Sequence, residues 1–206
     1  LRLNCDILLN DSRCVAVGEV GIDFTSSCLC DTRYSSPSSC VLDRQVKYLH
    51  LAIGKESRSG KALILHCRGE KAERDAYTIA LDILVEMQMT HLSIHLHCFN
   101  GTLTVAERWL KTCPNVYFGI GPLALGNRHF LKVVLMGISL NELLLESDSP
   151  YLRPKRSNTP CITFLELVPV ISRCCGMPQR VLCHICNVNA CKLYNLPLGI
   201  ISVAVQ

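Results

Sequence analysis

Five short apolar runs are spaced along this 206-residue chain, with longer amphipathic stretches between them. Each run is rich in aliphatic or β-branched residues and is too short to form a helix, so we predict five β-strands. The predicted strands span residues 15–19, 62–66, 92–97, 116–120 and 142–147. The segment 25–39, with its serines and cysteines, is predicted to be a long loop.

The amphipathic stretches predict helices, because their apolar residues recur at the spacing of one helical face. One face contains Leu42, Val46, Leu49 and Ile53, and another contains Ala76, Ile79, Ile83 and Met87. A third helix is predicted to begin near Thr104, whose hydroxyl is suited to form a capping box with Glu107 three residues later. Further helices are predicted at 128–136, 161–175 and 178–194.

The alternation of strands and helices favours a parallel sheet with helical connections. One strand-and-helix unit of a (β/α) barrel takes about 30 residues, and 31 residues separate His66 from His97. The expected fold class is therefore α/β, a TIM-type (β/α) barrel, with residues 1–206 as a single domain. Five strands do not close such a barrel, so we expect it to be N-terminally truncated, with about five of eight parallel strands present.

Composition and charge argue against a membrane protein and against a strongly basic nucleic-acid-binding module, but they do not indicate a reaction. Hydrophobic residues make up 49% of the chain and the mean hydropathy is +0.27, but no apolar run approaches the ~20 residues of a membrane span. We expect no membrane association, and the lack of signal-peptide order at the N-terminus favours the cytoplasm or nucleus. The formal net charge of +4 permits an anionic substrate, yet it is below that of a dedicated nucleic-acid-binding module.

Fourteen cysteines are scattered along the chain rather than arranged in a framework. Free cysteine is among the most buried residue types, so most of them are expected to be reduced structural thiols in an intracellular protein. Cys183 and Cys186 flank His184 at the spacing of half a zinc knuckle, but no second half lies at a suitable spacing. A structural zinc site is therefore not expected there.

Potential metal ligands lie at the C-terminal ends of four predicted strands. They are Glu19, His66, His97 and Asp148. Catalytic groups of (β/α) barrels project from the strand ends at one face of the barrel. An aspartate after a strand as apolar as 142–147 is costly to bury unless a cation or hydrogen-bond donors meet it. The pattern predicts a metal-dependent hydrolase.

Neighbouring residues on these strands have more than one predicted role. Arg68 points to the same side of its strand as His66, and it is predicted either to bind a substrate phosphate or to pair with a nearby carboxylate. His95 shares a side with His97 and is predicted either to be a second local ligand or to pack behind it. Glu146 is predicted to orient His97 or the attacking water.

Four segments resemble the signature blocks of the TatD family of metal-dependent deoxyribonucleases in order, spacing and position at strand ends. These segments are AVGEVGIDF (16–24), LILHCRGE (63–70), HLHCFNGT (95–102) and LLLESDSPYLRP (143–154). A further segment, VNACKLYNL (188–196), resembles the family's closing helix, so the resemblance covers essentially the whole chain. The TatD family belongs to the amidohydrolase-like superfamily of metal-dependent hydrolases.

This resemblance implies a divalent metal site and a DNA substrate. The implied ligands of magnesium, manganese or zinc are Glu19, His66, His97 and Asp148. Asp148 is also implied to accept a proton from the attacking water, and Asp23 to lie behind the ligands or on the following loop. The resemblance favours His97 over His95 as the ligand. The implied reaction is hydrolysis of a DNA phosphodiester by metal-activated water, with the family's 3′-exonuclease polarity.

The chain departs from the family in one respect. The family's first strand carries a His-x-His pair that supplies two further ligands, and no such strand precedes Glu19. The chain also begins with Leu1 rather than Met. We therefore expect it to be either a fragment of a competent enzyme or a poorly active remnant.

Two other functions remain open. One is a catalytically impaired TatD-like protein that binds nucleic acid or a protein partner, which the missing His pair favours and the four retained ligands oppose. The other is an amidohydrolase acting on a C–N bond. Its expected metal-bridging lysine is not evident at a strand end, since Lys61 lies at a strand start.

Overall fold

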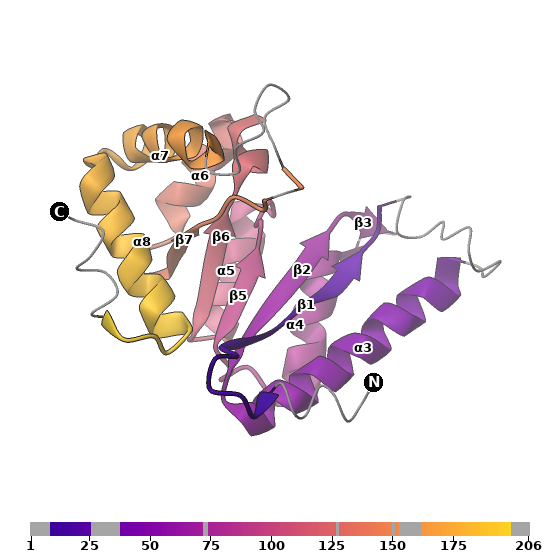
Figure 1. Cartoon of the computed structure of the whole chain (residues 1–206). Helices are drawn as coiled ribbons and strands as arrows, with labels where there is room; N and C mark the ends of the chain where they lie inside the picture. Colours follow the sequence, from indigo (N-terminus) through magenta and orange to yellow (C-terminus); the bar gives the residue numbers. More distant parts are fainter. Residues whose placement is uncertain are drawn as a thin grey trace. The chain divides into compact units, whose positions relative to one another are not determined.

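Five strands form one parallel sheet in the computed structural model, which describes residues 9–25, 38–71, 74–126, 128–149, 151–152 and 162–198. In sheet order they are β1 (Ala16–Asp23), β2 (Ala62–Arg68), β5 (Ile94–His97), β6 (Val116–Ile120) and β7 (Leu143–Leu145). All five predicted strands are confirmed, and Figure 1 shows them as arrows. Because β1 and β2 continue past their predicted ends, Glu19 and His66 lie within the strands rather than at the last position.

Helices connect the strands, as the alternation predicted. They are α3 (Ser38–Ser59), α4 (Ala76–Glu86), α5 (Leu103–Thr112), α6 (Arg128–Gly137), α7 (Ile162–Cys175) and α8 (Gln179–Leu193). Each one corresponds to a predicted helix. Most of the loop predicted at 25–39 lies outside the described residues, but its last two residues, 38 and 39, belong to α3, so the loop prediction was wrong there. None of the described helices has the length and apolar character that crossing a bilayer requires.

Several short elements were not predicted. They are the 3-10 helices η1 (Pro122–Gly126) and η2 (Leu140–Glu142) and the antiparallel hairpin of β3 (Glu70–Lys71) with β4 (Arg74–Asp75). Elements of two to five residues are too short to show a periodic pattern of apolar positions.

The start of α5 differs from the prediction. The helix begins at Leu103, and the N–H of Val105 donates to Thr102 Oγ1 at 3.3 Å, so Thr102 and not Thr104 is the capping residue. The predicted capping box with Glu107 is wrong, because Thr104 already lies in the first helical turn. An N-cap side chain accepts from an N–H three residues later, and Thr102 has this spacing to Val105.

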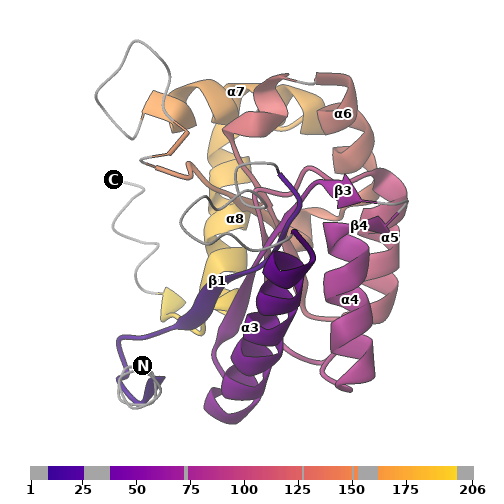
Figure 2. The ribbon, with the colours of Figure 1, turned by 90° about the vertical axis from the view of Figure 1, so that its right-hand side faces the viewer.

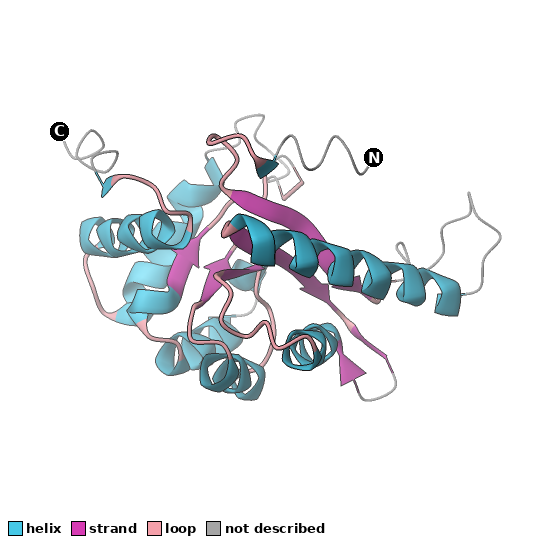
Figure 3. Ribbon diagram, turned by 90° about the horizontal axis from the view of Figure 1, so that it is seen from below, coloured by secondary structure: helices cyan, strands magenta, loops and turns pink. Residues whose placement is uncertain are grey.

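The chain divides into two compact units. The described residues of 1–96 and 112–116 form the first unit, and those of 97–111 and 117–206 form the second. In the first unit β1 and β2 pair in parallel along their length. The long helix α3 packs against β1, as Figures 2 and 3 show from two sides. Leu49 and Ile53 of α3 and Leu63 and Leu65 of β2 are fully buried in this unit.

The second unit contains β7 and the helices that cover it. Helix α8 packs against β7, and α7 packs against α6 and α8. The rings of Phe99 and Phe118 meet edge to face with centroids 5.0 Å apart. Asn189 of α8 is 1% exposed, and its amide donates to the carbonyl oxygens of Leu140 at 2.7 Å and Leu143 at 2.8 Å. These bonds fix α8 to the start of β7.

Candidate active site

Glu19 lies at a bulge in β1. Val17 pairs with Leu63 and Val20 pairs with Leu65, so β1 has one residue more than β2 between these two pairs. A bulge of this kind turns a side chain out of the regular alternation of a strand. The position of the Glu19 carboxylate therefore depends on the local irregularity of β1 and not on its pleat.

Two glycines make the bulge possible. Gly18 has a φ of 148°, which residues with a side chain rarely adopt, and a Cβ there would lie 2.7 Å from the Ile64 carbonyl oxygen. A Cβ on Gly21 would collide with the carbonyl oxygen of His66. Glycine at both positions therefore allows β1 to approach the backbone of β2 next to His66.

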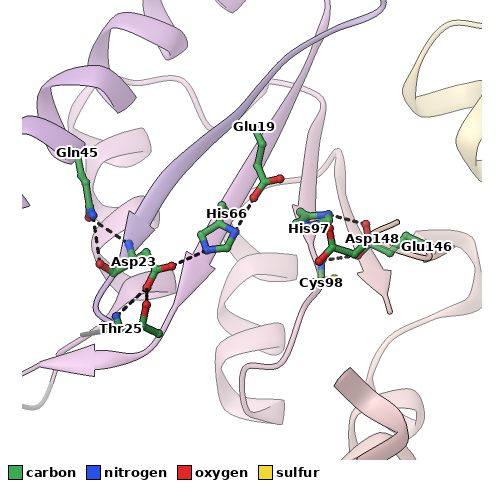
Figure 4. A network of polar contacts seen from close by, with 9 residues as sticks. All are labelled: Glu19, Asp23, Thr25, Gln45, His66, His97, Cys98, Glu146 and Asp148. Atoms are coloured by element: carbon green, nitrogen blue, oxygen red, sulfur yellow. Dashed lines mark hydrogen bonds and ion pairs between the residues drawn. The ribbon is translucent and has the colours of Figure 1, made fainter. Parts of the chain in front are cut away.

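His66 lies between two carboxylates of the first unit, as Figure 4 shows. Its Nδ1 is 2.5 Å from Glu19 Oε1, and its Nε2 is 3.1 Å from Asp23 Oδ2. The side chain of Glu19 is 43% exposed and that of Asp23 only 11%. Asp23 is therefore the buried partner that can orient the imidazole, and Glu19 is the partner that is open to solvent.

Asp23 is itself held on several sides. Its Oδ1 accepts from the N–H of Thr25 at 2.7 Å and from the Thr25 hydroxyl at 2.6 Å. The side chain of Gln45, on α3, accepts from the Asp23 N–H at 3.1 Å and donates to the Asp23 carbonyl oxygen at 3.2 Å. The carboxylate therefore has one oxygen committed to Thr25 and the other facing His66.

The carboxylates change the acidity of His66. The hydrogen bond with Glu19 raises the pKa of the imidazole, burial lowers it, and Asp23 raises it again, so the net shift is upward. A raised histidine pKa means that the surrounding charge favours a positive group at this position. The same electrostatics favour a bound cation.

His97 has a matching arrangement in the second unit, also drawn in Figure 4. Its Nδ1 is 2.7 Å from Glu146 Oε2, and its Nε2 is 3.6 Å from Asp148 Oδ1. The other oxygen of Glu146 accepts from the backbone N–H of Cys98. Glu146 therefore orients the imidazole from one side and leaves the other nitrogen toward Asp148, as the prediction that Glu146 orients His97 requires.

His97 is also surrounded by groups that favour its charged form. Burial lowers the pKa of the imidazole, but the hydrogen bonds with Cys98 and Glu146 outweigh burial and raise the pKa to about 11. The second cluster, like the first, thus favours positive charge at the position of its histidine.

The backbone is strained where the chain leaves the strands that carry this cluster. Cys98 has a φ of 45° and Asp148 a φ of 48°. Residues other than glycine rarely adopt such angles, and they gather at functional sites. At Asp148 the turn is closed by the N–H groups of Tyr151 and Leu152, which donate to the Asp148 carbonyl oxygen at 2.9 and 3.2 Å. This turn holds the carboxylate just beyond the end of β7.

Two further predicted site residues have simpler surroundings. Arg68 is the last residue of β2, and its carbonyl oxygen accepts from the Phe24 N–H at 2.9 Å. Its guanidinium forms no ion pair with any residue in the described ranges, and the predicted contact with a substrate phosphate stays a prediction. His95 is 6% exposed within β5, which agrees with a packed residue more than with a ligand.

The donor chemistry of both clusters fits a divalent cation. Histidine ligands of metals usually have a carboxylate or carbonyl at the nitrogen that does not face the metal. Asp23 has this position behind His66, and Glu146 has it behind His97. The nitrogen on the other side of each ring lies next to a further carboxylate, that of Glu19 or Asp148. Imidazole nitrogen with carboxylate oxygen suits zinc or manganese, and carboxylate alone suits magnesium.

Sequence reasoning missed three residues that complete these clusters: Thr25, Gln45 and Cys98. Thr25 and Cys98 are each within two residues of a predicted site residue, so the segments GIDFT and HLHC contain a usable signal. Gln45 is 22 residues from Asp23 and lies on a helix. No spacing rule connects these two positions, because only the packing of α3 on β1 brings them together.

The sequence matches the family described as TatD related DNase over residues 3–195. Among curated proteins it is 28% identical over 195 residues to the human 3′-5′ RNA nuclease TATDN2, covering 91% of this chain and 24% of that protein. It is 30% identical over 194 residues to the 3′-5′ ssDNA/RNA exonuclease TatD of Erwinia billingiae, covering 89% of this chain and 66% of that protein. The chain thus spans only part of the length of these relatives.

Solved structures show the same fold at lower identity. The YJJV protein of Escherichia coli K12, a TatD homologue, superposes with a TM-score of 0.67 and 21% identity, over 96% of this chain and 72% of its own. A TatD family hydrolase of Entamoeba histolytica superposes with a TM-score of 0.70 and 17% identity, over 94% of this chain and 66% of its own.

Proposed function

Because this chain belongs to the TatD-related DNase family, we propose that it is a metal-dependent nuclease that hydrolyses the phosphodiester bonds of DNA. The observation that carries the proposal is the cluster of His97, Glu146 and Asp148, in which an oriented imidazole at the end of β5 lies 3.6 Å from a carboxylate that follows β7. The names of the relatives, an RNA nuclease and an exonuclease of ssDNA and RNA, support a nucleic-acid substrate with attack from the 3′ end.

The proposed metal ligands are Glu19 and His66 of the first unit and His97 and Asp148 of the second. Asp23 and Glu146 orient the two imidazoles through the contacts described above. Magnesium, manganese and zinc are the candidate ions. A divalent cation held in either cluster would withdraw charge from a phosphoryl oxygen and make a nearby water molecule more acidic.

Asp148 is the proposed general base. Its carboxylate is partly buried, with 20% of the side chain exposed, and the turn closed by Tyr151 and Leu152 fixes its backbone. A carboxylate held in this way can accept a proton from the attacking water. His97 stays oriented by Glu146 throughout, so it keeps its second nitrogen toward Asp148.

Two residues are proposed to contact the substrate. Arg68 ends β2 beside the first cluster, and a guanidinium binds phosphate oxygens through its fork of donors. Tyr151 is 85% exposed and lies three residues after Asp148. An exposed aromatic ring offers a face on which an unpaired base can stack, which is how proteins bind single strands without sequence preference.

A labelled single-stranded DNA assay tests this function. With Mg²⁺, Mn²⁺ or Zn²⁺ we expect shortening from the 3′ end, and we expect Asp148→Ala and His97→Ala to lower the rate by about 10²–10⁴-fold. Asp43→Ala and His184→Ala are matched controls, because both residues are exposed and lie on helices. Activity that survives both active-site changes would contradict the mechanism. Binding of the DNA without any cleavage would instead support an impaired member of the family.

A further inference from the structure

Cys98 lies against the His97 cluster in a strained conformation. Its φ of 45° departs from the strand conformation of β5, and its N–H donates to Glu146. A Cβ on Gly121 would lie 2.8 Å from the Cys98 sulfur, so the thiol packs directly on the backbone of this glycine. The glycine at 121 and the left-handed turn at 98 together place Sγ beside His97.

The thiol and its neighbours form a compact donor set. One ligand atom from each of His97, Cys98 and Glu146 lies within 4.8 Å of the other two. Of the groups of three potential ligands that meet this spacing in the described chain, this one alone contains a cysteine. The motif of Cys183, His184 and Cys186 is not among them.

We propose that His97, Cys98 and Glu146 bind a soft divalent cation, Zn²⁺ or Cd²⁺, through the sulfur of Cys98. Thiolate ligands select soft ions, whereas carboxylate and water select Mg²⁺ and Mn²⁺. Zinc takes nitrogen and sulfur donors at about 2.0–2.3 Å, so two donors on opposite sides of the ion can be up to about 4.6 Å apart, close to the 4.8 Å within which these three donors lie. On binding, the thiol proton passes to solvent and the sulfur–metal bond takes its place, so no oxidant or reductant is needed.

The proposed soft-ion site shares His97 and Glu146 with the proposed active site. A soft ion held by Cys98 would use the residues that orient and hold the hard ion, so the two ions compete. This competition rests on the proposed function, but the binding of the soft ion does not. The structure therefore assigns Cys98 as the residue that decides which ion the second unit accepts.

Titration of the whole 206-residue chain with Cd²⁺ tests the assignment, because a cadmium–thiolate bond gives an ultraviolet charge-transfer band. We expect Cys98→Ser to remove the part of this band that corresponds to one bound Cd²⁺. We also expect it to weaken Cd²⁺ binding by more than roughly 10–100-fold, which is the effect of losing a residue that only orients a metal ligand. Cys14→Ser is the matched control, since Cys14 is also a partly exposed free thiol. An unchanged band and affinity in Cys98→Ser would overturn the proposal.

A second measurement uses the unaltered chain and so does not depend on the folding of a variant. Cd²⁺ should slow the alkylation of Cys98 by iodoacetamide, followed peptide by peptide by mass spectrometry, more than that of Cys14. Equal protection of the two thiols would contradict the proposal. Failure of the nuclease proposal is separable, since it shows as absent DNA cleavage with Mg²⁺ or Mn²⁺ while the protection of Cys98 by Cd²⁺ persists.

Discussion

His66 and His97 have the same arrangement of acceptors around the ring. In each cluster one carboxylate is buried and held by backbone or side-chain donors, namely Asp23 or Glu146. The other carboxylate, Glu19 or Asp148, faces the remaining nitrogen and is more exposed. The buried acid fixes the tautomer and the plane of the ring, and the exposed acid is left to bind a cation.

Glu56 is a buried acid that neither cluster uses. It lies on α3 with 2% of its surface exposed, and its Oε2 has no hydrogen-bond partner among the described residues. Burial raises the pKa of this carboxyl from its usual 4.5 to about 7. The folded chain therefore binds this proton more tightly than the unfolded chain does.

Glu56 should make the stability depend on pH. Its favourable contribution is complete below the unfolded-state pKa of 4.5 and is lost as the pH rises to the folded-state pKa of about 7. We expect Glu56→Gln to flatten this fall and to raise the free energy of unfolding at about pH 8 by up to about 3 kcal/mol. Urea denaturation across this range measures the effect. Asp43→Asn, at an exposed position of the same helix, is the control. Equal slopes for the native chain and Glu56→Gln would show that Glu56 is not the cause.

Among the elements, α8 both packs against β7 and is hydrogen-bonded to its start through the side-chain amide of Asn189. Asn189→Leu removes the donors to the carbonyl oxygens of Leu140 and Leu143 and leaves both without their present partner. We expect this change to lower the free energy of unfolding by about 2–4 kcal/mol, because each buried acceptor left unpaired costs about 1–3 kcal/mol. Asn187→Leu, at an exposed position of the same helix, should change it by less than about 0.5 kcal/mol. Thermal or urea unfolding of both variants decides between these outcomes.

Elements with a clear period were predictable from the sequence, and irregular ones were not. The strand at 116–120 matches β6 at both ends, since turn-forming residues, Pro and Asn before it and Gly and Pro after it, bound the apolar run. The predicted end of the first strand was four residues short, because the glycines at 18 and 21 resemble a turn while they form a bulge within β1. The helix start at Leu103 was also misplaced, since Thr102 and Thr104 are equally good caps by residue type.

The residues of the candidate site also differ in how far the sequence predicted their contacts. The contact of Glu146 with His97 agrees with one of the two roles predicted for Glu146, because both residues stand where strands of the same parallel sheet end, β7 and β5. The sequence did not predict the hydrogen bonds between the Gln45 side chain and the Asp23 backbone, because they depend on how α3 packs against β1. It also did not predict that the Cys98 thiol turns toward His97, because that orientation comes from a left-handed backbone angle. Side chains on regular elements were predictable, and those placed by packing or strain were not.

At the scale of the whole molecule, the family match covers residues 3–195, while the chain spans 66% of the Erwinia billingiae relative. The proposed metal-binding groups of these 206 residues are therefore compared with a family in which this relative is longer than the present chain. Its two clusters each contain a histidine with an orienting carboxylate, and both favour positive charge. The proposed function therefore requires a divalent cation for cleavage of DNA.

Removal and return of the metal on one sample test this claim most directly. The chain is dialysed against EDTA and then against buffer free of chelator, and hydrolysis of a 3′-labelled single-stranded DNA is measured before and after each of Mg²⁺, Mn²⁺ and Zn²⁺ is added back. We expect hydrolysis to fall to the rate without protein after EDTA and to return with at least one of these ions. Hydrolysis that continues unchanged in the metal-free chain would contradict this expectation.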